Sequence, residues 1–465
     1  MTLATRLLAS LDARLAGAPT PVFLGLSGGV DSMLLLDACH RLGIPLTAIH
    51  VHHGLQQDAD RWADFCREQA QQRGLDFICE NVRLDGGNNI EARARAARYA
   101  AFAKHAGQGS LLLAQHQDDQ AETLLLRLMR GAGAQGLAGM AGQRMQAGVT
   151  LIRPLLDVSR AHIEQLARDW QLDWVEDPSN ADARFERNWV RQQLLPAWQA
   201  HTPGIRQQLA RSASHLGEAA QLLDELAEQD RAQLADGAPG LSLTALAALS
   251  PPRRANLLRH WLADKEPYRP GEDVLARLQQ EVINARDDRQ PQLPLENGVL
   301  TRYRQRLYWV PSAAFAPPPP AHLWHLDQPL QLGPLQLEAS RETTAPSSPE
   351  IVVLSSCAPK GVAGSMHEPA PTAGHLHLPA ILTQLQVRFA QGGERILRNG
   401  KHQQISECWR AAGIPPWLRR WLPLFYLDEE LVAAAALGVA DNWQPETSSA
   451  TTIMAWRLQP DLTGC

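Results

Sequence analysis

The first 180 residues alternate short apolar runs with segments whose apolar residues recur every three or four positions. The apolar runs, at 22–26, 46–52, 77–82 and 111–114, are typical of buried strands. The segments between them predict helices, for example over 58–73 and 90–105. Such alternation predicts an α/β fold with a doubly wound parallel sheet and right-handed crossovers. Ligands of such sheets bind at the carboxyl ends of the strands.

The pattern changes further along the chain. Residues 201–236 have a helical period, Gly237 to Gly240 interrupt it, and an α-rich module ends near Val310 in two strand-like segments. There Arg302, Arg304 and Arg306 alternate, which predicts an exposed basic strand face. We therefore predict an α/β domain over 1–215, a mainly helical domain over 216–310, a Pro-rich linker and irregular segment over 311–380, and a small α+β carboxy-terminal domain over 381–465.

Composition places the chain among globular proteins. It has 465 residues, of which 45% are hydrophobic and 20% charged, enough for several buried cores. No apolar run is long enough to span a bilayer, and the amino-terminal segment does not have the pattern of a signal peptide. The six cysteines include no C-x-x-C pair, which suits a reducing compartment. We expect a cytoplasmic protein without membrane partners.

The charge is unevenly distributed. A formal net charge of −5 argues against a general nucleic-acid binder. Residues 388–420, however, contain seven basic side chains and only two acidic ones. The abundance of arginine over lysine is explained either by codon usage or by phosphate contacts, for which the planar guanidinium is well suited.

A glycine turn follows the first predicted strand. Its residues are Ser27, Gly28, Gly29, Val30, Asp31 and Ser32, and an apolar helix follows directly. Glycines allow the backbone to approach a ligand, and the free N–H groups of a helix start attract anions. A carboxylate beside a phosphate requires a bound cation or a role in proton transfer, and Asp31 is therefore the informative residue of this turn.

A second polar cluster follows the fourth predicted strand and opens a helix. It contains His116, Asp118, Asp119 and Glu122. Acidic residues at a helix start act as caps that complement its dipole, or they handle a metal ion or an amine. A zinc site formed by His52, His53 and His116 is a further alternative, although no cysteine supports it.

Ser27 to Ser32 resembles the pyrophosphate-binding loop of the N-type ATP pyrophosphatases (PP-loop superfamily). The later motifs are similar to those of the tRNA(Ile)-lysidine synthetase family. They are His52-His53-Gly54-Leu55, Ala94 to Tyr99, His116 to Thr123, Arg153-Pro154-Leu155-Leu156, Glu176 to Asn180, and Arg187-Asn188 with Arg191. That family usually has a second histidine where this chain has Gln115, which leaves His116 as the imidazole to test.

The resemblance implies a ligase that joins free L-lysine to C2 of the wobble cytidine in a tRNA(Ile) with a CAU anticodon, through an adenylated cytidine. ATP and Mg²⁺ are the implied cofactors, with residues 27–32 at the nucleotide. Asp31, His116, Asp118, Asp119 and Glu122 are the candidate catalytic residues, and Asp31, Asp118 and Asp119 the candidate metal ligands. A tRNA thiolase of the same superfamily, or a non-catalytic tRNA-binding module, is the alternative.

Contacts to tRNA are expected in two regions. Arg187, Asn188 and Arg191, in a stripe with Arg184, lie where the chain leaves the catalytic domain, and a solvated helix face is the competing explanation. Arg395, Arg398, Lys401 and Arg419 lie in the carboxy-terminal region, which the resemblance implies to bind the acceptor stem. The sequence leaves the oligomeric state open, including a homodimer, and does not identify the lysine pocket.

Overall fold

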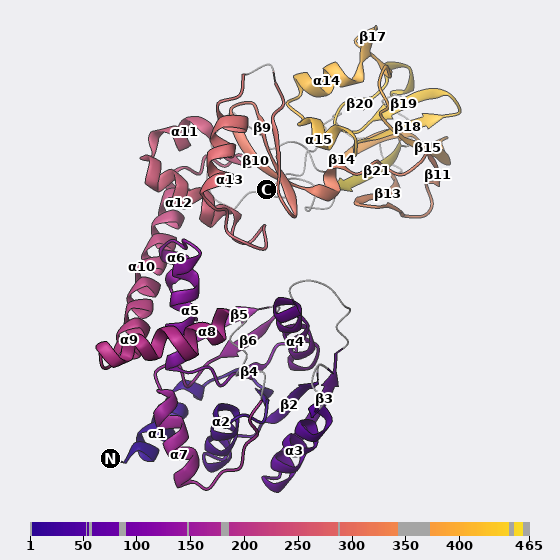
Figure 1. Cartoon of the computed structure of the whole chain (residues 1–465). Coiled ribbons are helices and arrows are strands. Elements are labelled where there is room, and N and C mark those ends of the chain that lie inside the picture. The colour runs from indigo at the N-terminus through magenta and orange to yellow at the C-terminus, as the bar shows by residue number, and fades with distance from the viewer. Residues whose placement is uncertain are drawn as a thin grey trace. The chain divides into compact units, whose positions relative to one another are not determined.

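The structure is a computed structural model that describes residues 2–52, 54, 58–82, 90–146, 148–177, 186–286, 289–342, 373–445 and 451–458. Parts of the expected motifs, including His53, Leu55, Pro178 to Asn180 and Arg184, lie outside these residues. The chain divides into two compact units, Met1–Leu222 and Leu223–Cys465, which are described separately below (Figure 1).

A six-stranded sheet forms the centre of the first unit. In spatial order its strands are β3 (Asp76–Asn81), β2 (Thr47–His52), β1 (Val22–Gly25), β4 (Ser110–Leu112), β6 (Val149–Ile152) and β5 (Gln143–Gln146). All neighbours are parallel except β5, which pairs antiparallel with β6. This confirms the predicted doubly wound α/β fold. The strand order reverses between β1 and β4, so the carboxyl ends of these two strands flank the position where such sheets bind ligands.

Helices cover both faces of this sheet. The connections are α1 (Leu3–Leu15), α2 (Val30–Arg41), α3 (Ala59–Gln72), α4 (Ile90–Ala106), α5 (Gln117–Met129), α6 (Ala134–Leu137) and α7 (Arg160–Asp169). One core joins buried leucines of α1, α2 and α7 to the sheet, whereas Phe102 and Ala106 of α4 belong to a separate core that includes Phe23 and Leu111. The apolar positions of the strands are buried on both faces, as parallel sheets require.

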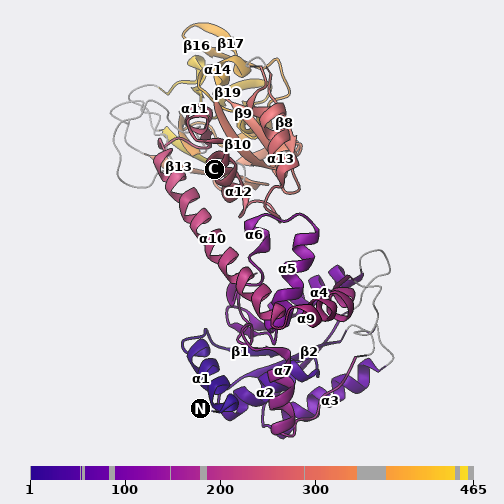
Figure 2. The same ribbon diagram turned by 60° about the vertical axis from the view of Figure 1, so that its left-hand side comes forward.

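The chain leaves this sheet through a run of helices. These are α8 (Glu186–Trp189), a π-helix η2 (Val190–Leu194), α9 (Leu195–His201) and the long α10 (Ile205–Gln233) (Figure 2). Buried Val190 and Leu195 pack against Leu125 of α5, which joins this run to the helices around the six-stranded sheet. The π-helix matters for the site described below because it carries Arg191.

The second unit begins with a helical module that packs on a four-stranded sheet. Its elements are β7 (Leu241–Ser242), α11 (Leu243–Ala248), α12 (Pro251–Leu262), α13 (Glu272–Arg277), η3 (Leu278–Ile283), β8 (Gln292–Pro294), β9 (Gly298–Tyr303) and β10 (Arg306–Pro311). The predicted basic face of β9 and β10 is wrong, since Arg302 and Arg306 are buried. Both guanidinium groups donate to backbone carbonyls, and Arg306 also binds Asp236.

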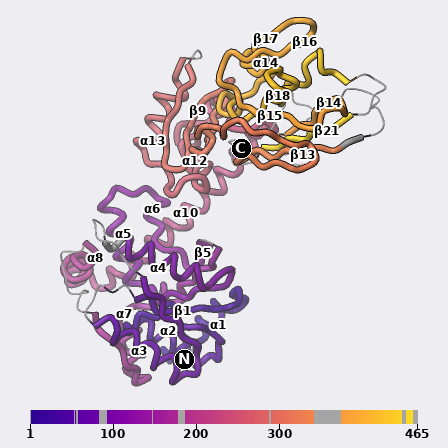
Figure 3. Tube along the Cα trace, turned by 90° about the vertical axis from the view of Figure 1, so that its right-hand side faces the viewer, coloured from indigo at the N-terminus to yellow at the C-terminus, as the bar shows by residue number. Residues whose placement is uncertain are grey.

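The segment expected to be irregular contains regular elements. Residues 312–342 form η4 (Ser312–Phe315), β11 (His322–His325), β12 (Leu330–Leu332) and β13 (Leu335–Glu342). β13 pairs with β21 (Thr451–Leu458), which also pairs with β14 (Ala373–Pro379) (Figure 3). The alternation of Leu330, Leu332, Leu335 and Leu337 was the strand signal, and the neighbouring prolines concealed it.

The remaining elements complete the carboxy-terminal part. They are β15 (Gln384–Phe389), β16 (Arg395–Arg398), β17 (Lys401–Gln404), α14 (Ile405–Ala411), α15 (Pro416–Arg419), β18 (Pro423–Leu427), β19 (Glu430–Ala434), β20 (Gly438–Val439) and η5 (Asp441–Trp443). Trp417 and Trp421 are buried in a core that extends to Tyr308 of β10 and Ala314 of η4. Trp421 also donates to the Ala314 carbonyl. The core of the carboxy-terminal part therefore joins residues that are about a hundred positions apart in the sequence.

Within the described part of the chain, no helix is both long and apolar enough to cross a membrane. The described cysteines, Cys39, Cys66, Cys79 and Cys408, are free thiols.

The Arg306 contacts generate a stability prediction. Arg306→Ala should lower the free energy of unfolding by about 2 kcal/mol, because it removes the partner of Asp236 and of three loop carbonyls. The hydrogen bond from Arg306 lowers the pKa of Asp236, so the pair stabilises the fold at neutral pH and the effect should shrink below about pH 4. Urea unfolding at pH 7 and pH 3.5 measures both. The exposed Arg277→Ala is the control, and equal stability of Arg306→Ala and wild type would contradict the prediction.

Candidate active site

The glycine turn follows β1 at the carboxyl edge of the sheet. The Leu26 N–H donates to Ile49 O at 2.8 Å, and the ring of His50 contacts Leu26 O at 2.9 Å, so β2 holds the start of the turn. Gly28 has a φ of +85°, and a Cβ placed there would lie 2.8 Å from Val175 Cγ2. Only glycine suits this position, because a side chain would be strained by both the φ angle and the contact.

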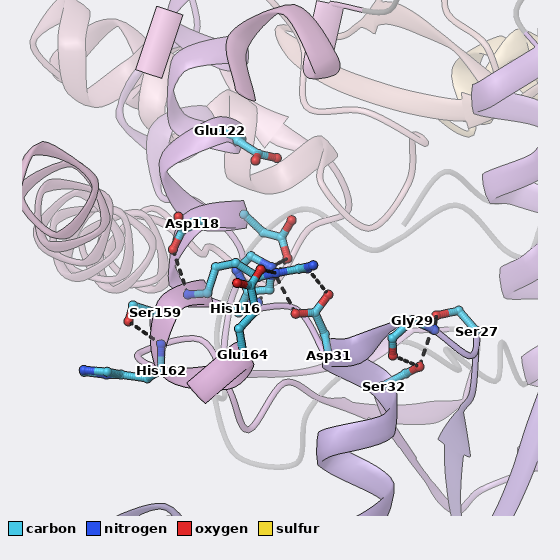
Figure 4. A network of polar contacts seen from close by, with 12 residues as sticks. Ser27, Gly29, Asp31, Ser32, His116, Asp118, Glu122, Ser159, His162 and Glu164 are labelled. Carbon is cyan, nitrogen blue, oxygen red and sulfur yellow. Dashed lines mark hydrogen bonds and ion pairs between the residues drawn. The ribbon is translucent and has the colours of Figure 1, made fainter. Parts of the chain in front are cut away.

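The hydroxyl groups of the turn organise its backbone. Ser32 Oγ donates to Gly29 O at 2.9 Å and lies 3.1 Å from Ser27 Oγ (Figure 4). Helix α2 starts at Val30 with Gly29 as its N-cap, and no side chain caps it. The N–H groups of its first turn are therefore available to an anion, as expected for a phosphate loop.

Helix α5 starts with His116 as its N-cap. The backbone N–H of His116 donates to Asp119 Oδ2 at 3.1 Å, which closes a capping box. His116 also forms an isolated parallel bridge with Leu155, and the Gln117 N–H donates to Val158 O, so the start of α5 is fixed next to the segment that enters α7.

The structure brings Asp31, His116 and Asp119 together. His116 Nε2 lies 3.6 Å from Asp31 Oδ1 and 3.5 Å from Asp119 Oδ2, and the His116 side chain is only 4% exposed. The imidazole therefore connects the glycine turn to the acidic cluster.

The two carboxyl groups beside His116 differ in their electrostatics. Burial raises the pKa of Asp31, although the charges of His116 and Arg160 partly oppose this. Burial acts in the same direction on Asp119, but the charges of His116 and Arg187 and the bond from the His116 N–H outweigh it, so the pKa of Asp119 is lowered. Asp31 Oδ1 is buried without a hydrogen-bond partner. The negative charge of Asp119 is thus already balanced by its neighbours, whereas the Asp31 carboxylate is able to bind a further cation.

Asp118 faces a different set of partners. Its Oδ1 accepts the backbone N–H of Arg160 at 3.1 Å, and its Oδ2 lies 3.0 Å from Arg206 Nη1. It therefore joins the start of α7 and the start of α10 to α5. Sequence reasoning grouped Asp118 with Asp31 and Asp119 as metal ligands. Among the described residues, no three His, Cys, Asp or Glu side chains are arranged to hold a metal ion, and this applies equally to the zinc alternative.

Two arginines predicted to contact tRNA lie against the acidic cluster instead of forming a free stripe. Arg187 bonds Asp119 and Glu122 at 2.9 Å each, and Arg191 bonds Glu122 at 2.6 Å and lies 3.3 Å from Asp119. Glu122 is fully buried, so these pairs are needed to stabilise its charge. Asn188, between them, is also buried. A contact of any of these residues with tRNA stays a prediction.

Sequence reasoning missed two residues of this site, Arg160 and Arg206. Arg160 Nη1 binds Asp31 Oδ2 at 2.6 Å, although the two residues are 129 positions apart. The serine at 159 signalled a helix start, but no local pattern indicated where the following side chain points.

The carboxy-terminal candidates lie on one hairpin and a nearby helix. In the hairpin β16–β17, Arg398 is directly opposite Lys401, joined by Asn399 and Gly400 at positive φ. This is a two-residue turn of the type that Asn-Gly favours. Arg395 and Lys401 are exposed, whereas Arg419 Nε donates to Ile414 O and is partly buried.

Comparison with known proteins gives the family. Residues 4–198 match the PP-loop domain, residues 241–308 the TilS substrate binding domain, and residues 385–456 the TilS substrate C-terminal domain. A tRNA(Ile)-lysidine synthase of Alkalilimnicola ehrlichii is 40% identical over 90% of this chain and 89% of its own. The chain belongs to the tRNA(Ile)-lysidine synthase family. A tRNA(Ile)-lysidine synthase of Serratia proteamaculans is 37% identical over 96% of this chain and 97% of its own length.

Among solved structures, the chain is similar to the U34-tRNA thiolase NcsA of Methanococcus maripaludis. The TM-score is 0.39 and the identity 16%, over 46% of this chain and 80% of that chain.

The geometry separates the roles of two adjacent aspartates. Asp118→Ala should lower the free energy of unfolding by about 1–2 kcal/mol, because the Arg160 N–H and the Arg206 guanidinium lose their acceptor, and leave turnover per folded molecule within about threefold of wild type. Asp119→Ala should reduce turnover about 100-fold or more with a smaller change in melting temperature. Calorimetry and single-turnover assays on the same samples test both. Asp118→Asn, which keeps an acceptor for the Arg160 N–H, is the control, and the reverse pattern would contradict these assignments.

Proposed function

We propose that this chain carries out the reaction of its family at the Asp31–His116–Asp119 cluster. The family membership makes the chain an ATP-using ligase that forms lysidine in tRNA. The observation that supports this location is the meeting of a phosphate-type turn with a buried imidazole and two carboxyl groups whose pKa values shift in opposite directions. Sites that combine acid, base and ion-binding roles typically contain titratable groups whose surroundings shift their pKa values in opposite directions.

The chemistry has two steps. The oxygen on C2 of the wobble cytidine attacks the α-phosphorus of ATP, and pyrophosphate leaves. The adenylated carbon is then attacked by the amine of free L-lysine, the amine proton passes to the enzyme, and AMP leaves. Adenylation is needed because the C2 oxygen is otherwise a poor leaving group. The base has to leave its stack, which costs little in a single-stranded loop.

The described residues fit these steps. The N–H groups of the first turn of α2, which no side chain caps, would bind the phosphates, and the Ser32 hydroxyl holds the backbone of the turn. Mg²⁺ bound to nucleotide phosphates uses one or two carboxylates, and the unpartnered Asp31 Oδ1 fits as one of them. When bound, Mg²⁺ neutralises phosphate charge. His116, between two carboxyl groups, is positioned to accept the proton of the attacking amine.

The thiolase alternative requires a reactive cysteine. Cys66 lies near the turn, with its Sγ 3.9 Å from Leu26 O, but burial raises the pKa of this thiol to about 12. A thiol with such a pKa is not a nucleophile at neutral pH. This buried thiol agrees with the family match, which favours the ligase.

The tRNA would contact a second surface in the carboxy-terminal part. Arg398 and Lys401 are paired across the tip of the hairpin β16–β17, and like charges directly opposite each other are unfavourable unless an anion binds them. The hairpin lies at the periphery of its unit in all three ribbon and tube views. Phosphate groups of the acceptor stem are the anions we propose.

Asp31→Asn should abolish ATP–pyrophosphate exchange in the presence of tRNA(Ile), because the amide cannot replace the charge of a metal-binding carboxylate. It should also abolish lysidine formation from ATP and free lysine, measured by mass analysis of the nucleosides. Asp12→Asn, an exposed carboxyl-to-amide change on α1, is the matched control. Exchange at the wild-type rate in Asp31→Asn would reject the proposed metal role.

The hairpin is tested through salt dependence. Arg398→Ala combined with Lys401→Ala should weaken tRNA binding and reduce the slope of log affinity against log salt by up to about 2. ATP affinity should not change. The control removes the same charge elsewhere, with Arg6→Ala and Arg61→Ala. Point variants are preferable to truncation at residue 380, because the carboxy-terminal core includes Tyr308 and Ala314. An unchanged slope would show that the hairpin does not bind phosphate.

A further inference from the structure

Arg160 occupies the carboxylate to which the proposed function assigns a metal ion. Its Nη1 lies 2.6 Å from Asp31 Oδ2, while its Nε lies 2.9 Å from Glu164 Oε1. In the described part of the chain, His116 and Arg160 are the basic residues recorded in ion pairs with the turn 27–32. Arg160 is thus the arginine in direct contact with the phosphate turn.

The backbone and the side chain of Arg160 are held differently. Its backbone N–H is bonded to Asp118, which is itself paired with Arg206, so the start of α7 is fixed. Its side chain is 39% exposed, and both of its partners are carboxylates. The guanidinium can therefore move while the helix start remains in place.

A divalent cation on Asp31 Oδ1 and the Arg160 guanidinium on Asp31 Oδ2 compete for the negative charge of one carboxylate. When a cation binds Asp31, the favourable interaction of Arg160 with Asp31 is lost, and the arginine needs another anion. A nucleotide triphosphate brings several negative charges to the same turn, and a guanidinium binds phosphate oxygens in a bidentate manner. Glu164, one turn further along α7, holds the Nε edge of Arg160 and leaves its other nitrogens able to reach a neighbouring anion.

We propose that Arg160 is a ligand of the nucleotide phosphates that pairs with Asp31 and Glu164 in the free enzyme and moves to the phosphates when a divalent cation binds Asp31. The proposal rests on the proposed function, because it requires a nucleotide and a cation at the turn. Arg160 thus pairs first with the carboxylates of Asp31 and Glu164 and then with the phosphates. The structure contains the first of these pairings.

The test measures two affinities of the full-length protein without any turnover. Titration calorimetry gives the affinity for ATP in the presence of Mg²⁺, and electron paramagnetic resonance gives the affinity for Mn²⁺ alone. Arg160→Ala should weaken ATP binding about 10- to 100-fold, as expected for loss of a charge-assisted contact. The same variant should bind Mn²⁺ about threefold or more tightly, because a competing cation has been removed from Asp31.

Arg168→Ala is the matched control. Arg168 is also on α7 and also pairs with Glu164, at 3.0 Å, but it does not contact Asp31. It should retain wild-type affinity for both ligands. Arg160→Lys, which keeps the charge, should recover part of the ATP affinity, and it replaces the alanine variant if that variant does not fold.

Two results would overturn the proposal. ATP affinity of Arg160→Ala within about twofold of wild type would show that Arg160 does not bind phosphate. A fall in both affinities would show that Arg160 only positions Asp31. These outcomes are distinct from failure of the proposed function, because in that case the wild-type protein itself would not bind ATP.

Discussion

Three carboxyl groups in the first two turns of one helix constrain the whole catalytic unit. Asp118, Asp119 and Glu122 are all buried, and a buried charge is stable only if opposite charges and hydrogen bonds surround it. Their partners come from later parts of the chain, with Arg187 and Arg191 on α8 and η2, and Arg206 on α10. The helices that follow the sheet therefore have to pack where they do, and the shape of the site follows from this pairing.

Much of the catalytic fold was predictable from the sequence because local patterns determine it. The apolar runs became β1 to β4, and the glycine turn precedes α2 as expected. The predicted helices over 58–73 and 90–105 correspond to α3 and α4. The strands β11 to β13 were missed because they lie next to a run of prolines, and their partners are as distant as β21.

The candidate site was predictable in its residues but not in their pairing. Glycine, serine and acidic residues at the start of a helix form a recognisable sequence pattern. This pattern identified Asp31, His116 and Asp119 as candidates. The contact of Arg160 with Asp31 depends on the packing of α7 beside α2, and no sequence period encodes it. For the same reason Arg302 and Arg306 were expected on the surface: alternation shows that side chains share a face, but not whether another element covers that face.

The acidic cluster and its arginine partners are far apart in the sequence. This distance also affects how the protein folds during synthesis. Asp119 and Arg187 are 68 positions apart, and Glu122 depends on the same arginines. During synthesis, α5 leaves the ribosome on the order of ten seconds before these partners do. The nascent chain must therefore keep these carboxylates hydrated, so the first strands can assemble early while α5 docks only after the helices around Arg191 emerge. Slow translation between these two regions would prolong the exposure of the apolar residues by which α5 packs against Val190 and Leu195.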